Sequence, residues 1–225
     1  MNAEIVIRFL VTALSKVGKE YYGGRIEEWM FDNHGIDRNH PKRKSLEKYL
    51  DRYGERVFCY ELYHQVRVLI DNYYAEHQGQ LVGPKVTFQG ELRKNQIESV
   101  IQYFANENIS SLNKEYIPDF LLHSIGNFDG QELIVEVKTN PILTVNDIKG
   151  VLAKIQEFII RYGYRKGVFM SINSSSEVIT SCIMSITRSK FYRDDLINKA
   201  DITFIHKQGI DTPLSQWTLD MLPAE

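Results

Sequence analysis

Apolar residues recur along this chain with two different spacings, which predict where helices and strands lie. Residues 5–17 carry apolar side chains every three or four positions, the spacing of an amphipathic helix. Residues 45–77 are rich in helix formers and free of proline, with Ser45 as the expected N-cap. They predict one long helix, or two helices if Gly54 interrupts the pattern. Residues 148–162 predict a further amphipathic helix.

Shorter runs between these helices either alternate polar and apolar residues or are apolar throughout, as strands do. The helix at 148–162 is expected to start at a cap formed by Asn146. The remaining patterns predict strands within 83–95, 116–124, 131–140, 166–173 and 201–209, and helices at 25–31, 97–104 and 174–200.

The order of the main elements is helix, three strands, helix, strand, helix and strand, which favours an α/β sandwich with a mixed sheet. With 225 residues and 43% hydrophobic composition, the chain can bury one sizeable core. Glycines and a proline follow the first helix, so we expect an N-terminal helical accessory segment at 1–44 and a main domain at 45–225. The accessory segment is the expected contact for a second copy of the chain or for a protein partner.

Composition narrows the class of partner and the compartment. The formal net charge of −2 excludes a strongly basic surface, so nucleic acid would have to bind through local basic patches. Cys59 and Cys182 lie far apart in apolar helical patterns, as buried free cysteines do, which favours a reducing, cytoplasmic setting. No apolar stretch approaches the roughly 20 residues that a membrane helix requires, so we expect no membrane contact.

Three charged residues, Asp119, Glu136 and Lys138, interrupt the two apolar strands on either side of the turn GNFD. If those four residues form the loop, Asp119 falls opposite Glu136 in an antiparallel pair, with Cβ atoms about 5 Å apart. Since side chains alternate along a strand, Lys138 shares the face of Glu136, while Val135 and Val137 point into the core. Two opposed carboxylates repel each other, and a hard divalent cation between them would remove the repulsion.

That arrangement suits hydrolysis of a phosphodiester bond. A Mg²⁺ ion, or Mn²⁺ in its place, would polarise a phosphoryl oxygen and lower the pKa of a bound water. The ammonium of Lys138 could hold that water beside the cation without binding the metal itself. The competing interpretation is a solvated strand face, on which Glu136 and Lys138 pair with neighbours across the sheet.

At these positions the chain resembles the PD-(D/E)XK nuclease superfamily. The resemblance is carried by Pro118-Asp119 and by Glu136-Val137-Lys138, which lie on adjacent strands within the predicted element order. It implies a restriction-endonuclease-like αβββαβ core, in which helices flank a mixed central sheet. It also implies that Asp119, Glu136 and the Val137 carbonyl bind Mg²⁺. Lys138 is then the catalytic lysine, and DNA is the substrate.

Many members of that superfamily add an acidic residue from the helix before the first strand, and Glu61 stands in the corresponding helix. Its neighbours are mostly apolar or aromatic, so Glu61 is expected to be partly buried and to need a partner, which the cation could supply. An ion pair with Arg56 or Arg67 is the alternative. One turn later, His64 could donate to a phosphate or hold Glu61, unless it is simply a structural histidine.

Three residues on the helix at 148–162 are candidates for weaker contacts with nucleic acid. Lys149 and Lys154 could bind the phosphates on either side of the scissile bond if they flank the mouth of the site, although such lysines often belong to a solvated face. Gln156 matches a glutamine that one branch of the superfamily carries on this helix, but Ile160 replaces the tyrosine that follows it there.

The sequence therefore predicts a Mg²⁺-dependent nuclease that hydrolyses DNA through an Asp/Glu-bound ion and a lysine-assisted water. The first alternative is a nuclease-fold module that binds nucleic acid or a protein partner without cutting. The second is a metal-dependent hydrolase of small phosphorylated molecules. The preference for DNA over RNA comes from the resemblance, because no residue here is identifiable as a reader of the 2′-hydroxyl.

Overall fold

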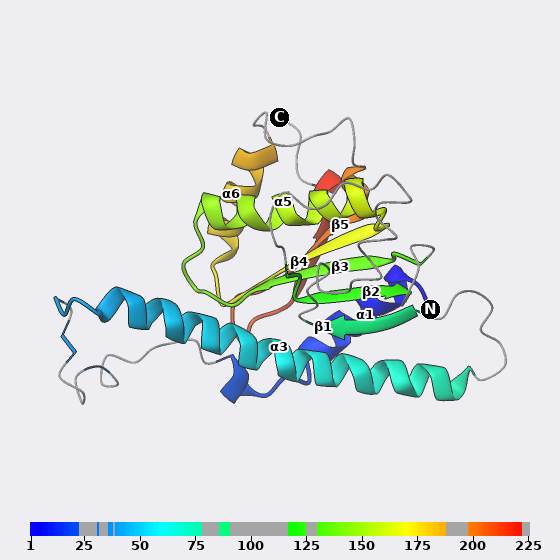
Figure 1. Ribbon diagram of the computed structural model, residues 1–225, viewed down its shortest axis with the longest axis horizontal. Helices are drawn as coiled ribbons and strands as arrows, with labels where there is room; N and C mark the ends of the chain where they lie inside the picture. Colours follow the sequence, from blue (N-terminus) through cyan, green and yellow to red (C-terminus); the bar gives the residue numbers. More distant parts are fainter. Residues whose placement is uncertain are drawn as a thin grey trace, which may run out of the picture.

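The described part of the chain, shown as a computed structural model in Figure 1, forms a six-stranded sheet with helices on both faces. The structure describes residues 1–22, 31, 36–37, 39–77, 86–90, 117–124, 130–187 and 198–221, apart from the side chains at 48, 49, 51, 52 and 187. Its helices are α1 (Ala3–Leu14), α3 (Arg43–Glu76), α5 (Val145–Tyr162) and α6 (Ser176–Thr187), with short 3-10 helices η1 (Lys19–Tyr21), η2 (Lys199–Asp201) and η3 (Leu219–Met221). Its strands are β1 (Val86–Gly90), β2 (Phe120–Ser124), β3 (Leu133–Lys138), β4 (Lys166–Ile172), β5 (Ile202–Lys207) and β6 (Ser215–Thr218).

The strands lie in the sheet in the order in which they occur along the chain, β1-β2-β3-β4-β5-β6. β1, β2 and β3 pair antiparallel, β3, β4 and β5 pair parallel, and β6 returns antiparallel to β5. The predicted order from the long helix to β5 and the predicted mixed sheet are confirmed. The pattern along the chain does not predict β6, because this short strand is mostly polar and has no buried face.

Helices cover the two faces of the sheet in pairs (Figure 1). α5 and α6 lie on one face, where they pack with Ile134, Phe169 and Phe204. The two parallel crossovers, β3-α5-β4 and β4-α6-β5, run in the same direction along the sheet, and their common right-handedness puts both helices on one side. α1 and α3 cover the other face, where Val135 and Val137 belong to a separate apolar cluster.

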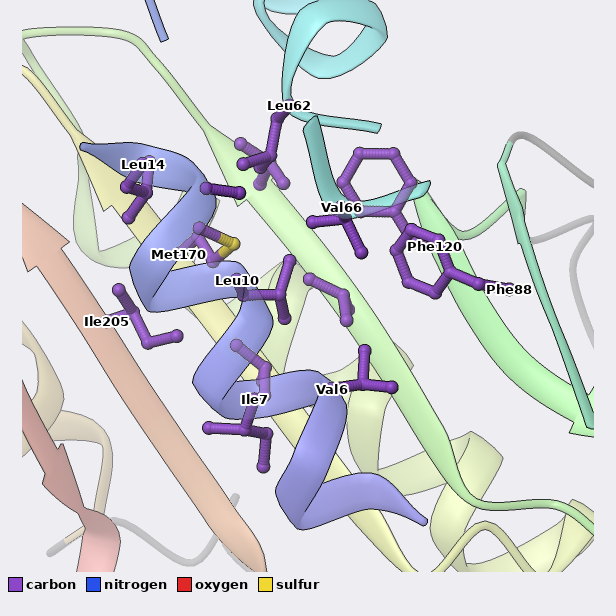
Figure 2. Close-up of a cluster of buried hydrophobic side chains, with 14 of the residues drawn as sticks. Val6, Ile7, Leu10, Leu14, Leu62, Val66, Phe88, Phe120, Met170 and Ile205 are labelled. Atoms are coloured by element: carbon purple, nitrogen blue, oxygen red, sulfur yellow. The ribbon is translucent and has the colours of Figure 1, made fainter. Parts of the chain in front are cut away.

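α1 is part of the core beneath this sheet. Val6 and Leu10 of α1 are completely buried. They share one cluster with Val66 of α3 and Met170 of β4, as Figure 2 shows. The segment at 1–44, predicted as an accessory to the main domain, therefore contributes a helix to the main core.

α5 starts at a capping box formed by Thr144 and Asp147, which corrects the predicted cap at Asn146. The Asp147 backbone N–H donates to the Thr144 hydroxyl at 3.2 Å, and the Thr144 backbone N–H donates to the Asp147 carboxylate at 2.9 Å. These bonds satisfy donors that the first turn of a helix otherwise leaves open. The helix ends at Gly163, whose φ of 66° lies in the left-handed region that glycine adopts without strain.

α3 is one uninterrupted helix of 34 residues. It begins after Lys42, which makes no side-chain capping bond, so the predicted cap Ser45 lies inside the helix. Gly54 does not break it. A helical glycine costs only about 1 kcal/mol, less than the burial of Phe58 and Leu62 in the following turns contributes.

Several predicted features lie outside the described residues. These are most of the helix at 25–31, the helix at 97–104, the turn GNFD, and residues 188–197 of the helix at 174–200, whose last residues lie in the cap and first turn of η2. Cys59 and Cys182 are both buried and free, as predicted. Within the described ranges, no helix combines the length and the apolar composition needed to cross a membrane.

Candidate functional site

The strand register brings two acidic residues to opposite positions of the β2–β3 pair. Phe120 of β2 pairs with Val135 of β3. The same register, extended by one residue, places Asp119 opposite Glu136, as the sequence predicts. The Val137 backbone N–H donates to Asp119 Oδ2 at 2.7 Å, which ties Asp119 to β3 just before β2 begins.

Both acids lie on the sheet face that α5 covers. Leu121 and Ile134 belong to the apolar cluster beneath α5 and α6. Because side chains alternate along a strand, Asp119 and Glu136 share that side of the sheet. Val137 is completely buried in the opposite cluster, so Val135 and Val137 point away from the acids as predicted, although the face that carries the acids is also apolar and buried farther along both strands.

Glu136 is almost fully buried, with a relative exposure of 1%. Lys154 of α5 donates to its Oε2 at 2.6 Å, whereas its Oε1 is buried and has no hydrogen-bond partner among the residues that the structure describes. Burial first, and the negative charge of Asp119 second, raise the pKa of Glu136 to about 8 against the opposing effect of Lys154. A buried polar atom without a partner is costly, so a ligand at Oε1 would stabilise this site.

Asp119 is less buried than Glu136, with intermediate exposure of the residue. Burial raises the pKa of Asp119 to about 6, although the charge of Lys138 and the hydrogen bond from Val137 both lower it. Two neighbouring acids whose pKa values both lie above the ordinary range are typical of a functional site. A cation would favour the charged forms of both and would displace their protons.

Lys138 lies beside these acids and forms an ion pair with Glu55 of α3, in which Nζ lies 2.7 Å from Oε1. Burial lowers the pKa of Lys138, but the carboxylates of Glu55 and Asp119 outweigh that effect, so the pKa is raised overall. Lys138 is therefore positively charged at neutral pH. Its side chain is only partly buried, and Glu55 holds its ammonium group.

Glu55 is the acid that α3 brings to this site, and it is not predicted from the sequence. Glu61, the predicted residue, instead accepts a hydrogen bond from Gln65 Nε2 at 2.6 Å. The two glutamates are six positions apart, which places them about 120° apart around a helix. Glu55 shares the buried face of Phe58 and Leu62, so the apolar periodicity of α3 could have selected it. The assignment of Glu61 as a metal ligand stays a prediction.

Lys154 lies within the site. Besides its bond to Glu136, its Nζ donates to the Ile117 carbonyl oxygen at 3.2 Å. A lysine so placed offsets part of the charge of the two acids and fixes the orientation of Glu136. The predicted contact between Lys154 and a phosphate stays a prediction.

The other residues predicted to contact nucleic acid are dispersed. His64 is exposed on α3, whereas Gln156 is buried and its Nε2 finds no hydrogen-bond partner within the described ranges. Lys149 precedes Lys154 by five positions and therefore lies about 140° away around α5. The two lysines lie on different sides of the helix and do not flank the acids as a pair. Contact of His64, Lys149 and Gln156 with nucleic acid stays a prediction.

The donor atoms of this site suit a hard divalent cation. Asp119 and Glu136 supply carboxylate oxygens, and the carbonyl of Val137 is the third predicted ligand. In the part of the chain that the structure describes, no group of three or more His, Cys, Asp or Glu side chains is arranged to hold a metal ion. Glu55 is paired with Lys138. The binding of a cation would therefore depend on Asp119 and on Oε1 of Glu136, which has no hydrogen-bond partner among the described residues.

The function has to be inferred from this geometry. No protein-family model matches the sequence, and no curated protein matches it. The site offers two opposed acids with raised pKa values, two lysines paired with carboxylates, and a third acid from α3. Such a cluster can bind a cation and a negatively charged substrate next to each other.

Proposed function

We propose that this protein is a Mg²⁺-dependent nuclease of the PD-(D/E)XK type that hydrolyses phosphodiester bonds in DNA. The observation that carries the proposal is the opposition of Asp119 and Glu136 across β2 and β3, with Glu136 Oε1 buried and without a partner in the described part of the chain. Lys138 stands two residues after Glu136 and therefore on the same side of β3. The choice of DNA as the polymer rests on the resemblance described above.

The arrangement of elements supports the same proposal. α3, β1, β2, β3, α5 and β4 follow one another in the order of a restriction-endonuclease-like core. The acids lie on the β2–β3 pair, and the helices on the two sides of the sheet each bring a charged side chain to it, Glu55 from α3 and Lys154 from α5. A mixed sheet occurs in many α/β folds, so membership of the superfamily is itself part of the proposal.

In the proposed site, Asp119, Glu136 and the Val137 carbonyl hold Mg²⁺, with Mn²⁺ as a substitute. When bound, the ion supplies Lewis acidity toward water and the phosphoryl group and offsets their negative charge. Lys154 occupies Oε2 of Glu136 and leaves Oε1 for the ion. Both acids would act as ligands only when ionised. Near neutral pH, Glu136, with a pKa of about 8, would have to release its proton, whereas Asp119, with a pKa of about 6, is mostly ionised already.

Lys138 has two tasks in this proposal. Its ammonium donates a hydrogen bond to the attacking water, and its charge stabilises the negative charge that grows on the phosphoryl oxygens. Glu55 is a positioning residue, because it holds Nζ of Lys138 from the opposite layer of the fold. An ammonium has three donors, so Lys138 can keep its bond to Glu55 and still contact water and substrate.

Nicking of a supercoiled plasmid tests the proposal. We expect the wild-type protein to nick DNA in the presence of Mg²⁺ or Mn²⁺ and to stop when EDTA is added. Lys138→Ala should lower the rate by about 100-fold or more, as the loss of one stabilising donor does in other hydrolytic sites.

Lys166→Ala is the matched control. Lys166 is also a partly buried lysine in an ion pair with a helical glutamate, Glu4 of α1, at 2.7 Å. It starts β4 opposite Leu133, whereas Lys138 ends β3, so the two lysines lie at opposite ends of the sheet. Lys166→Ala should nick DNA as the wild type does. Equal losses in the two variants, or nicking that persists in EDTA, would contradict the proposal.

Two other functions would give different results in the same experiment. A nuclease-fold module without catalysis would bind DNA or a protein partner and would never nick the plasmid. A hydrolase of small phosphorylated molecules would release phosphate from nucleotides and leave the plasmid intact. The presence of Asp119, Glu136 and Lys138 together favours catalysis over the first of these, because a binding module needs no opposed acids.

A further inference from the structure

α3 carries apolar side chains on two opposite faces. Phe58, Leu62 and Val66 form the face that packs beneath the sheet. A second set lies roughly 180° away around the helix. We call this set the outer stripe, and it consists of Leu46, Leu50, Tyr53, Val57 and Tyr60. A surface helix needs only one apolar face to join a core, so the outer stripe requires a separate explanation.

The outer stripe is exposed to solvent at its two tyrosines. Tyr53 and Tyr60 are 60% and 56% exposed, and the three aliphatic members are only partly buried. A contiguous apolar row on a helix surface marks a place where another protein binds. α3 runs along the outside of the sheet and extends past it (Figure 1).

The spacing of the outer stripe indicates that its partner is another helix. Successive members are four, three, four and three residues apart, which is the heptad pattern of a coiled coil. Leu50 and Val57 take the a positions of this heptad, and Leu46, Tyr53 and Tyr60 take the d positions. Val57 at a and Leu46 at d match the residue types that favour two-stranded, parallel pairing, whereas Leu50, Tyr53 and Tyr60 carry no such preference.

We propose that a second copy of this chain docks on the outer stripe, with the two α3 helices parallel and in register. The residue before each a position is called g, and the residue after each d position is called e. In a parallel pair, a g residue lies beside the e residue five positions later in the other helix. Arg56 then meets Glu61 of the partner subunit. Lys42, the residue before α3, comes beside Glu47 of the partner subunit, and within each chain Glu47 also pairs with Arg43 at 2.7 Å. Two-fold symmetry repeats each contact. Antiparallel pairing would instead bring Glu47 beside the partner's Glu61, where like charges repel.

This dimer does not depend on the proposed nuclease activity. Glu55 reaches Lys138 on the sheet side of α3, whereas the outer stripe lies on the opposite side of the helix. In the dimer, the paired helices would lie between the two sites. A protein of this fold without catalytic activity could form the same dimer.

The mass in solution tests the pairing. Sedimentation equilibrium of the full chain at high concentration should give twice the chain mass of 26.2 kDa. Val57→Glu places a charge at an a position and should raise the dimer dissociation constant by about tenfold or more, a change of about 1.4 kcal/mol or more. Val178→Glu, at a 42% exposed apolar residue of α6, is the matched control and should leave the mass unchanged.

A wild-type protein that stays monomeric at every concentration would overturn the proposal, and so would a Val57→Glu dimer as tight as the wild type. Far-UV circular dichroism checks that the variant is folded. If Val57→Glu fails that check, Tyr53→Glu replaces it, because Tyr53 is well exposed and its loss removes little from the core of the monomer.

Disulfide trapping tests the register. In a parallel, in-register pair the two d positions at Tyr53 face each other, so Tyr53→Cys should form an intermolecular disulfide under mild oxidation. Lys44→Cys is also exposed on α3 but lies outside the outer stripe, and it should not form one. The native Cys59 and Cys182 are buried and should not interfere. Equal trapping of both variants, or of neither, would contradict the in-register arrangement.

Discussion

The carboxyl group of Glu136 is subject to opposing influences. Burial and the charge of Asp119 favour its neutral form, whereas Lys154 favours its charged form. Lys154 bonds to only one of its oxygens, so a cation at the other would add a second and stronger stabilisation of the charge. Protonation and metal binding therefore compete at this residue.

Without metal, this competition makes stability depend on pH. Folded Glu136 keeps its proton up to a pKa of about 8, whereas the unfolded chain releases it near the ordinary value of 4.5. Between these values the folded state binds more protons than the unfolded state, so the free energy of unfolding falls as pH rises. The raised pKa of Asp119, about 6, acts in the same direction over the lower part of this range.

Thermal unfolding in EDTA measures this effect. We expect the melting temperature of the wild type to fall between about pH 5 and about pH 8. Glu136→Gln cannot titrate in this range, so its melting temperature should fall less steeply. If the melting temperatures of the two proteins fell equally steeply with pH, Glu136 would not retain its proton in the folded state.

Lys154→Met removes the partner of a buried acid. The variant should lose about 1–3 kcal/mol of unfolding free energy, the cost of leaving a buried polar group without its partner. Lys166→Met breaks the more exposed pair with Glu4 and should lose less than about 1 kcal/mol. Urea unfolding near neutral pH measures both, and equal losses would mean that Lys154 does not stabilise Glu136.

The acids of the site can be predicted from sequence, but one of their partners cannot. Asp119, Glu136 and Lys138 follow from a short turn and from the alternation of side chains, both of which are local properties. Lys154 reaches Glu136 only because α5 packs on the sheet at a particular angle. No local pattern fixes that angle, so Lys154 is recognisable as a basic helical residue but not as the partner of Glu136.

Among the elements, α3 combines the largest number of roles. It packs against the sheet through Phe58 and Leu62, holds Lys138 through Glu55, and presents the outer stripe on its far side. Glu55 can hold Lys138 because it lies on the packed face, where the helix comes close to β3. The position of an acid around the helix, more than its position along the chain, therefore decides which acid serves the site.

Glu55→Gln and Glu61→Gln distinguish the two candidate acids of α3. Glutamine keeps the volume of Glu55 but loses the charge that holds Lys138. We expect Glu55→Gln to slow plasmid nicking by about tenfold or more, and by more than Glu61→Gln does. Because Glu55 raises the pKa of Lys138, the high-pH limit of activity should also shift to lower pH in Glu55→Gln. A larger loss in Glu61→Gln would assign the role to Glu61.

The order of the elements is predictable here because the helical and strand spacings of apolar residues are both clear. The ends of the elements are not predictable in the same way. Thr144 and Asn146 are both residues that cap helices, and only the path of the chain before α5 decides between them. α3 begins after Lys42, whose side chain makes no capping bond in the described structure, so no capping residue in the sequence marks that end. β6 is short and mostly polar, and it is recognisable only from its pairing with β5.

At the scale of the whole molecule, the candidate site lies between the helices on the two faces of the sheet. α3 lies on one face of the sheet and α5 on the other, and the β2–β3 pair lies between them (Figure 1). Glu55 comes from one layer and Lys154 from the other, so the site depends on both cores. The helix at 5–17 is predictable from its apolar stripe, but its docking beneath the strands is not, because periodicity does not say which surface a stripe will meet.

Binding of Mn²⁺ tests most directly the claim that Asp119 and Glu136 together hold a divalent cation. Calorimetric titration of the metal-free full chain near pH 8 should show saturable binding to the wild type with release of protons to the buffer. Glu132→Gln is the matched control, because Glu132 is also a buried glutamate but lies just before β3, paired with Arg165. Glu136→Gln should bind Mn²⁺ about 100-fold more weakly, or not at all, while Glu132→Gln binds it as the wild type does. A wild type that does not bind Mn²⁺, or a Glu136→Gln variant that binds it equally well, would contradict the claim.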